Sequence, residues 1–134
     1  MKIKQSEAIK AFRSIRDLNC QKMPSGKLAK QVYELYTKLK PAYDFQVQEE
    51  QKIYIDHPEF DPSIGGISLK GKTPEEKQKA IEEAKAIDNE LQELSDLDFE
   101  LDYDERFTID LDKIPSVQFS GEDIGNLEKF INFI

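Results

Sequence analysis

Cysteine is nearly missing from this chain, since Cys20 is the only one among 134 residues. A single thiol cannot form an internal disulfide, so a disulfide-stapled scaffold is excluded and a reducing compartment is expected. No apolar run approaches the roughly 20 residues that cross a bilayer, and no apolar stretch follows the basic residues of the N-terminus. We therefore expect neither a membrane contact nor a secretion signal, and a cytoplasmic location.

Residue sets that carry chemistry are equally scarce. His57 is the only histidine, and no nucleophile elbow is present, so a serine or cysteine triad is not supported. One histidine beside the loop carboxylates Asp56, Glu59 and Asp61 is a weak set of metal ligands, and a solvated loop is the favoured interpretation. The sequence predicts a protein that is not an enzyme, with no catalytic residue, metal site, cofactor or small-molecule substrate.

Charge, in contrast, is abundant and unevenly divided. The chain holds 19 Lys and Arg against 27 Asp and Glu, for a net charge of −8. Residues 1–40 contain ten basic side chains against three acidic ones, whereas residues 88–112 contain eleven acidic side chains against Arg106 alone. Blocks of opposite sign can meet within one molecule or between neighbouring copies, and both steer the approach of charged partners.

An unbroken alternation of apolar and acidic residues runs from Leu97 to Asp104. Successive side chains of a strand point to opposite faces, so the pattern predicts a half-buried strand with one acidic face. A turn over 104–106 and a second alternation from Phe107 to Leu111 predict a β-hairpin. The apolar face of the first strand holds Leu97, Phe99, Leu101 and Tyr103, and the acidic face holds Asp98, Glu100, Asp102 and Asp104.

The rest of the chain has mainly helical periodicity. Pro41 lies where the second helical pattern continues, which predicts one kinked helix rather than two. Thr73, Pro74 and Glu76 form a capping box that starts a further helix, expected to lie antiparallel to the preceding one. The predicted segments are helices over 6–55, a loop over 57–72, a helix over 74–95, a β-hairpin or small sheet over 97–119 and a terminal helix over 121–134, in one domain over 1–134.

These segments predict the fold class α+β. An antiparallel helical hairpin with a leading helix would pack against a small antiparallel sheet, and a short C-terminal helix would follow. That terminal helix carries apolar residues on more than one face, so it either closes the core or docks on a partner. The candidate partner-binding residues are Asp98, Glu100, Asp102, Asp104, Phe130, Phe133 and Ile134.

One stretch matches a nucleotide-binding motif. Gly66 to Thr73 fits the P-loop pattern GxxxxGK followed by Ser or Thr. The residues before it do not form an apolar strand, and Pro74 has no N–H for a phosphate. A loop that leads into a capped helix is the favoured interpretation, and a nucleotide-binding enzyme is the least favoured function.

A regulatory binding role is the second alternative. Alternate residues of a strand repeat at roughly 6.6–6.8 Å, about twice the spacing of phosphates along one DNA strand, so the acidic face is a candidate DNA mimic. The basic N-terminal helices are a candidate contact for nucleic acid, although the overall acidity disfavours it.

The N-terminal half resembles small structural proteins of undefined role that phages and prophages encode. The resemblance lies in Ser6-Glu7-Ala8 at the first helix, Lys22-Met23-Pro24 at the turn, and Leu35, Leu39 and Lys40-Pro41 in the second helix. Acidic strands before a short terminal helix also fit. The resemblance implies a structural or assembly role through protein partners or self-association, in a bacterial host or in the virion, and it carries over no catalytic residue.

Overall fold

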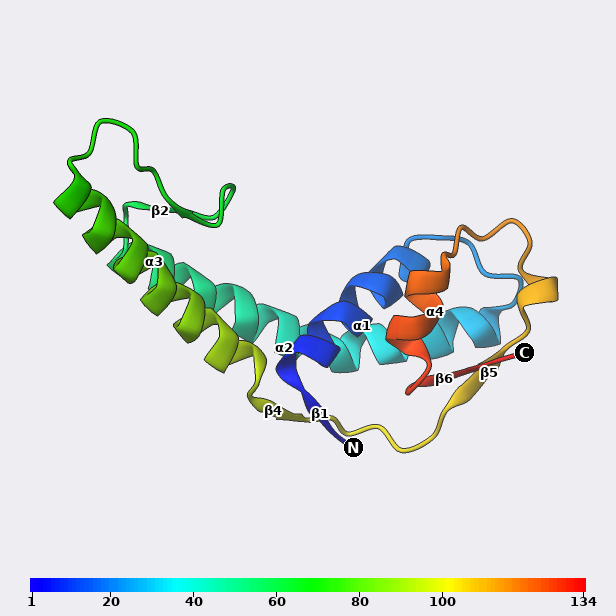
Figure 1. Ribbon diagram of the computed structural model, residues 1–134. Helices are drawn as coiled ribbons and strands as arrows, with labels where there is room; N and C mark the ends of the chain where they lie inside the picture. Colours follow the sequence, from blue (N-terminus) through cyan, green and yellow to red (C-terminus); the bar gives the residue numbers. More distant parts are fainter. The chain divides into compact units, whose positions relative to one another are not determined.

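The chain is α+β, with four α-helices, six short strands and one 3-10 helix in a computed structural model that describes residues 1–134 (Figure 1). It divides into two compact units. Unit 1 comprises Met1–Asp44 and Asp98–Ile134, and unit 2 comprises Phe45–Leu97, so unit 2 is inserted into the sequence of unit 1. The elements are β1 (Lys2–Lys4), α1 (Gln5–Asn19), α2 (Gly26–Asp56), β2 (Phe60–Asp61), β3 (Gly66–Ile67), α3 (Pro74–Ser95), β4 (Asp98–Glu100), β5 (Phe107–Ile109), the 3-10 helix Leu111–Lys113, α4 (Gly121–Leu127) and β6 (Ile131–Phe133).

α1 forms where apolar residues recur at helical spacing. It begins at Gln5, one residue before the predicted start, and the backbone N–H of Lys4 donates to Glu7 Oε1 at 3.1 Å. That bond satisfies one of the donors that a helix start leaves free. Ala8 and Ile15 are fully buried on the face that α1 turns toward the core of unit 1.

α2 continues through Pro41 as one helix, which confirms that part of the prediction, and the kink stays a prediction. Proline has no N–H and removes one bond of the helical ladder. The buried side-chain amide of Gln5 donates to the carbonyl of Ala42 at 2.6 Å, one residue beyond the proline. This bond ties the start of α1 to α2 inside unit 1 and gives the buried Gln5 a partner.

The strands of unit 1 do not form the predicted hairpin. β4 pairs antiparallel with β1, with Phe99 opposite Ile3, and β5 pairs parallel with β6, with Thr108 opposite Asn132. Each half of the expected hairpin therefore takes its partner from one end of the chain. The physical reason is burial, because pairing with β1 and β6 brings Ile3, 4% exposed, and the fully buried Ile131 into the core cluster.

The predicted terminal helix is wrong beyond Leu127. α4 ends there, and the chain continues as β6. Ile131 is fully buried whereas Asn132 is exposed, which is the alternation of a strand and not the periodicity of a helix. Sheet pairing with β5 satisfies the backbone groups of these last residues.

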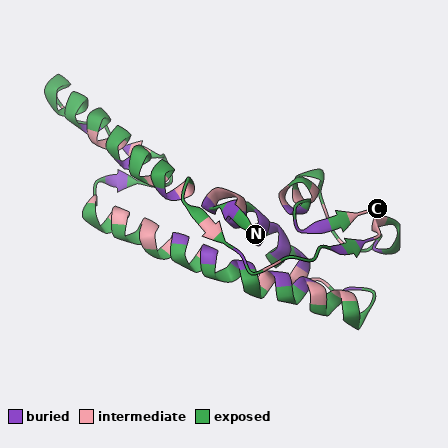
Figure 2. Cartoon of the chain, turned by 90° about the horizontal axis from the view of Figure 1, so that it is seen from below, coloured by how far each residue is buried: buried purple, intermediate pink, exposed green.

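The core of unit 1 joins residues from both halves of its sequence (Figure 2). The ring of Phe12 stacks on Tyr43 at 4.6 Å and on Tyr36 at 5.3 Å between centroids. Contacts of that length are those of favourable offset stacking. The buried members are Ile3, Ala8, Ala11, Phe12, Ile15, Leu18, Met23, Val32, Leu35, Leu39, Ala42, Leu101, Phe107, Ile109, Ile114, Leu127, Phe130 and Ile131.

Unit 2 contains the end of α2, the β2–β3 pair and α3. The segment predicted as a loop over 57–72 instead carries a small antiparallel hairpin, with Phe60 opposite Ile67 and both side chains buried. α3 spans Pro74–Ser95, which confirms the predicted helix, and Thr73 Oγ1 accepts from the backbone N–H of Glu76 at 3.2 Å. The antiparallel pairing of α3 with the preceding helix stays a prediction.

Candidate functional site

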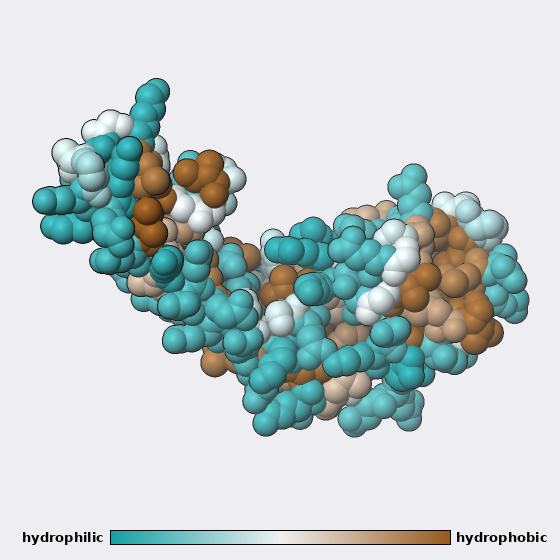
Figure 3. Space-filling model, viewed as in Figure 1, coloured by the Kyte–Doolittle hydropathy of each residue, from teal (hydrophilic) through white to brown (hydrophobic).

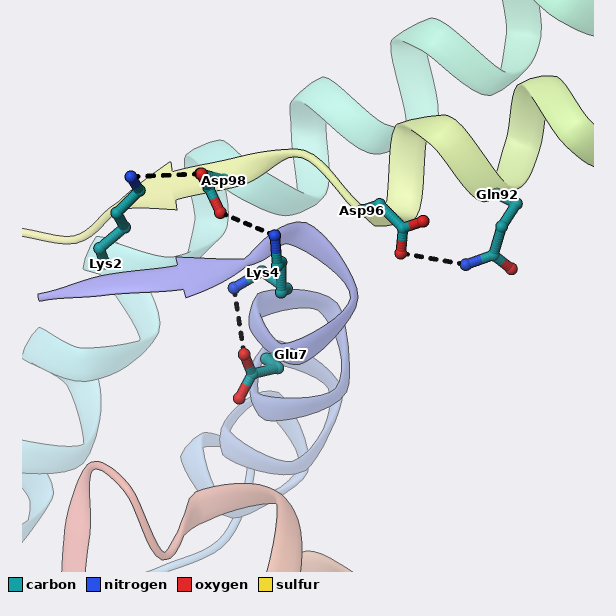
Figure 4. A network of polar contacts seen from close by, with 6 residues as sticks. All are labelled: Lys2, Lys4, Glu7, Gln92, Asp96 and Asp98. Atoms are coloured by element: carbon teal, nitrogen blue, oxygen red, sulfur yellow. Dashed lines mark hydrogen bonds and ion pairs between the residues drawn. The ribbon is translucent and has the colours of Figure 1, made fainter.

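The acidic row, which comprises Asp98, Glu100, Asp102 and Asp104, begins with a carboxylate that forms ion pairs with lysines of the N-terminus. Asp98 lies between Lys2 and Lys4 across the β1–β4 ladder, with Nζ to carboxylate distances of 3.3 Å and 3.1 Å (Figure 4). Hydrogen bonds from Lys4 and Lys2 hold the pKa of Asp98 below its usual value. Glu100 lies 3.5 Å from the terminal ammonium of Met1. The basic and acidic blocks thus meet within unit 1 of one molecule.

The rest of the row lies along unit 1 as an extended segment. Phe99, Leu101 and Tyr103 turn toward the core, as predicted, but Leu97 is 47% exposed and does not. The carboxylates of Asp102 and Asp104 are exposed. No group of three or more His, Cys, Asp and Glu side chains in the chain is placed to hold a metal ion.

Three hydrogen bonds to residues 128–131 fix this extended stretch. The Tyr103 hydroxyl donates to the carbonyl of Phe130, and burial raises the pKa of that hydroxyl. The guanidinium of Arg106 donates to the carbonyls of Glu128 and Ile131. The acidic row is therefore anchored at its end by neutral and basic side chains that reach the C-terminal residues.

The three C-terminal candidates have different surroundings. Phe130 is 1% exposed and belongs to the core, so it has no surface for a partner. Phe133 is partly buried and its ring lies 5.2 Å from that of Phe119. Ile134 is 65% exposed. Of the predicted apolar anchors, Ile134 alone stands clear of the core.

His57 faces α3 and not the loop carboxylates that follow it in the sequence. Its Nδ1 lies 3.2 Å from Glu83 Oε1 and its Nε2 lies 3.8 Å from Glu90 Oε2. The two glutamates are seven residues apart and share one face of α3. His57 therefore links the end of α2 to α3 within unit 2, a role that its neighbours in sequence do not indicate.

The stretch from Gly66 to Thr73 combines a strand, a turn and a helix cap. Its first two residues form β3, and Gly71 has φ +75°, the left-handed region that favours glycine. Thr73 Oγ1 is engaged by the N–H of Glu76, and Thr73 N donates to Glu76 Oε1 at 3.3 Å. The hydroxyl that a P-loop offers to magnesium here caps α3.

Unit 2 exposes large apolar side chains that the sequence did not mark as functional (Figure 3). Away from the ends of the unit, Ile55 is 77% exposed, Ile64 61%, Ile81 40% and Leu69 37%. The buried members of its core cluster also number four: Phe60, Ile67, Ala80 and Ile87. The sequence gives one indication that two of these side chains are exposed. Ile55 follows Tyr54 and Ile81 follows Ala80, and both preceding residues pack in the core of unit 2, so Ile55 and Ile81 lie off the packed face of their helices.

The two units differ sharply in charge. Unit 1 holds thirteen Lys and Arg against fourteen Asp and Glu, so its charges nearly cancel. Unit 2 holds six against thirteen and carries almost all of the net charge of the chain. The apolar side chains of unit 2 therefore lie in a strongly acidic setting.

Comparison with known proteins gave no match: no family model, no curated protein and no solved structure is similar to this chain. None of its helices combines the length and the apolar character that a membrane span requires.

Proposed function

We propose that this chain is a non-enzymatic protein that acts through protein–protein contacts, in a structural or assembly role. The observation that carries the proposal is the surface of unit 2, where Ile55, Ile64, Leu69 and Ile81 are exposed beside a core cluster of only four buried residues. These four exposed side chains are called the unit 2 apolar set below. The phage-type setting rests on the resemblance of the N-terminal half.

The size of the apolar set supports a contact surface. Fully burying an exposed Ile or Leu side chain contributes about 1.5–3 kcal/mol to an interface. Ile55 and Ile64 have the most area to bury, because Ile81 and Leu69 are already more than half covered. Single exposed apolar residues are ordinary on protein surfaces, whereas apolar residues gathered into one large patch mark interaction sites. The proposal takes the unit 2 apolar set to form such a patch. A partner that covers the set would enlarge the apolar interior that unit 2 lacks on its own.

The charge of unit 2 selects among partners. Its excess of carboxylates attracts basic surfaces and repels acidic ones, and it keeps the exposed apolar side chains from associating indiscriminately. The acidic row of unit 1 supports the alternative of a DNA mimic less well, because Asp98 and Glu100 already have cationic partners within unit 1.

Site-specific photo-crosslinking in cells that naturally produce the chain tests the proposal. A benzophenone amino acid replaces Ile64 in one variant and Lys10 in a matched control. Lys10 is exposed on α1 in unit 1. We expect a discrete protein adduct from position 64, lost when Ile55→Asp is added, and none from position 10. No adduct from position 64, or equal adducts from both positions, would contradict the proposal.

A further inference from the structure

β5 has one paired edge and one open edge. In a parallel ladder, alternate residues of a strand bond to the neighbour. Ile134 N donates to Ile109 O at 3.0 Å and Leu111 N donates to Ile134 O at 3.0 Å, so Ile109 and Leu111 use the edge that faces β6. The backbone groups of Thr108 therefore point to the opposite edge, as does the N–H of Asp110. Since the sheet contains only β5 and β6, no strand covers that edge.

This open edge borders a hollow of about 570 Å³ in unit 1. The hollow lies between β5 and the start of α2, and Thr108 and Asp110 line it on the strand side. A strand edge beside a helix is the arrangement in which some recognition domains bind an extended peptide as an added strand. The remaining lining residues are Pro24, Ser25, Lys27, Leu28, Gln31, Lys113, Ile114 and Ile134.

The lining has both apolar and basic parts. Leu28 is partly buried and Ile114 is buried, and together with the exposed Ile134 they form the apolar part of the lining. Lys27 and Lys113 also line it, and the N-terminus of α2, whose dipole adds partial positive charge, lies on the same side as Lys27. Asp110 opposes them from the strand, with its carboxylate 3.9 Å from Lys113 Nζ.

Of the other strand edges, those of β1, β2, β3 and β6 are charged, short or covered. On the outer edge of β6, the guanidinium of Arg106 donates a hydrogen bond to the carbonyl of Ile131, with a donor–acceptor distance of 3.1 Å. β2 and β3 have two residues each. β1 carries Lys2 and Lys4, a device by which edge strands avoid pairing with other chains.

We propose that β5 accepts an extended segment of a partner protein as a third strand in this hollow, and that the segment carries acidic residues on either side of an apolar one. The backbone of Thr108 would bond to the segment, the apolar residue would contact the apolar part of the lining, and the acidic residues would meet Lys27 and Lys113. This site lies in unit 1 and does not depend on the unit 2 apolar set, so either proposal can fail alone.

Selection from a library of random peptides of about ten residues, displayed on yeast, tests the inference with the full chain as bait. The peptides selected should be acidic and apolar in alternation. A selected peptide, made with a fluorescent label, should bind Thr108→Pro about tenfold more weakly or worse, because proline removes the outward N–H and leaves the ladder to β6 intact. Circular dichroism should show both proteins equally folded.

A charge-reversal pair provides a second measurement that keeps the outward N–H. Lys113→Glu should weaken binding of the same peptide, whereas Lys10→Glu, the same charge change on α1, should not. Failure to select any peptide, selection of basic peptides, or equal binding to Thr108→Pro would overturn the proposal. A dimer of the chain that Thr108→Pro dissociates would also overturn it, because a second copy would then be the occupant.

Discussion

Replacing Ile87 by alanine should open unit 2 and leave unit 1 folded. Ile87 is fully buried on α3, in a cluster with only three other buried residues. Truncation of a buried isoleucine to alanine costs about 2–5 kcal/mol. A unit of roughly 50 residues has about 3–8 kcal/mol of stability at the usual ~0.05–0.15 kcal/mol per residue. The substitution therefore removes a large share of the free energy that keeps unit 2 closed.

Hydrogen–deuterium exchange with mass spectrometry measures this loss segment by segment. A decrease of about 2 kcal/mol in local stability should speed exchange roughly 30-fold in amides that exchange through opening of unit 2. Peptides from α3 should show this increase. Peptides from α1 should exchange at the rate of the unchanged protein, because α1 packs in the separate core of unit 1.

The matched control is Ile15→Ala, the same truncation at a fully buried position of α1. It should speed exchange in unit 1 instead. Equal acceleration of α1 and α3 peptides by Ile87→Ala would refute the reasoning, since the two cores would then unfold as one. Unchanged exchange in α3 would also refute it, because the small cluster would not be what holds unit 2 together.

Three further substitutions test individual contacts. Thr73→Ala should lower the free energy of unfolding of unit 2 by about 1 kcal/mol through loss of the α3 cap, whereas Thr37→Ala, within α2, should change the urea midpoint less; equal effects would argue against the cap. The pKa of Asp98 is lowered in the folded chain, so its contribution to stability is present above the unfolded pKa of about 3.9 and is lost as pH falls through the folded pKa. Asp98→Asn should therefore lower the melting temperature at pH 6 and not at pH 2. An equal loss at both pH values would count against the ion pairs. Gln5→Leu should cost about 1 kcal/mol in urea unfolding because the bond to the Ala42 carbonyl is lost, and an unchanged midpoint would show that this bond does not contribute.

The elements that the sequence predicted well have signals contained in a few neighbouring residues. The cap at Thr73 and the proline after it mark the start of α3, and both act within one helical turn. The continuity of α2 through Pro41 followed from the same apolar periodicity on either side of it. Local chemistry decides these features, so no knowledge of the rest of the chain was needed.

The strand pairing failed because its partners are far away in the sequence. β1 and β6 have three residues each, too few for an alternation to stand out. The acidic row looked like half of a hairpin because a turn followed it directly, yet Phe99 pairs with Ile3, which lies 96 residues earlier in the chain. Such pairing is chosen by burial in the finished core, which neighbouring residues do not encode.

The candidate surfaces divide in the same way. The outward position of Asp98, Glu100, Asp102 and Asp104 followed from alternation alone. The exposure of the apolar side chains of unit 2 did not follow from the sequence. An isoleucine such as Ile64 is expected in the core until the size of the core around it is known. The open edge of β5 could be identified only from the parallel pairing with β6, which no local sequence pattern predicted.

The insertion of unit 2 into unit 1 sets an order for events on the ribosome. About 90 residues separate the end of α2's first half from the last strand of unit 1, and at roughly 5–20 residues per second their synthesis takes on the order of 5–20 s. Unit 2, which is continuous, can close during that interval, while the apolar faces of α1 and α2 wait for β4, β5 and β6. The nascent chain therefore exposes the apolar faces of α1 and α2 early and covers them last. During this interval it is most open to chaperone binding and to aggregation.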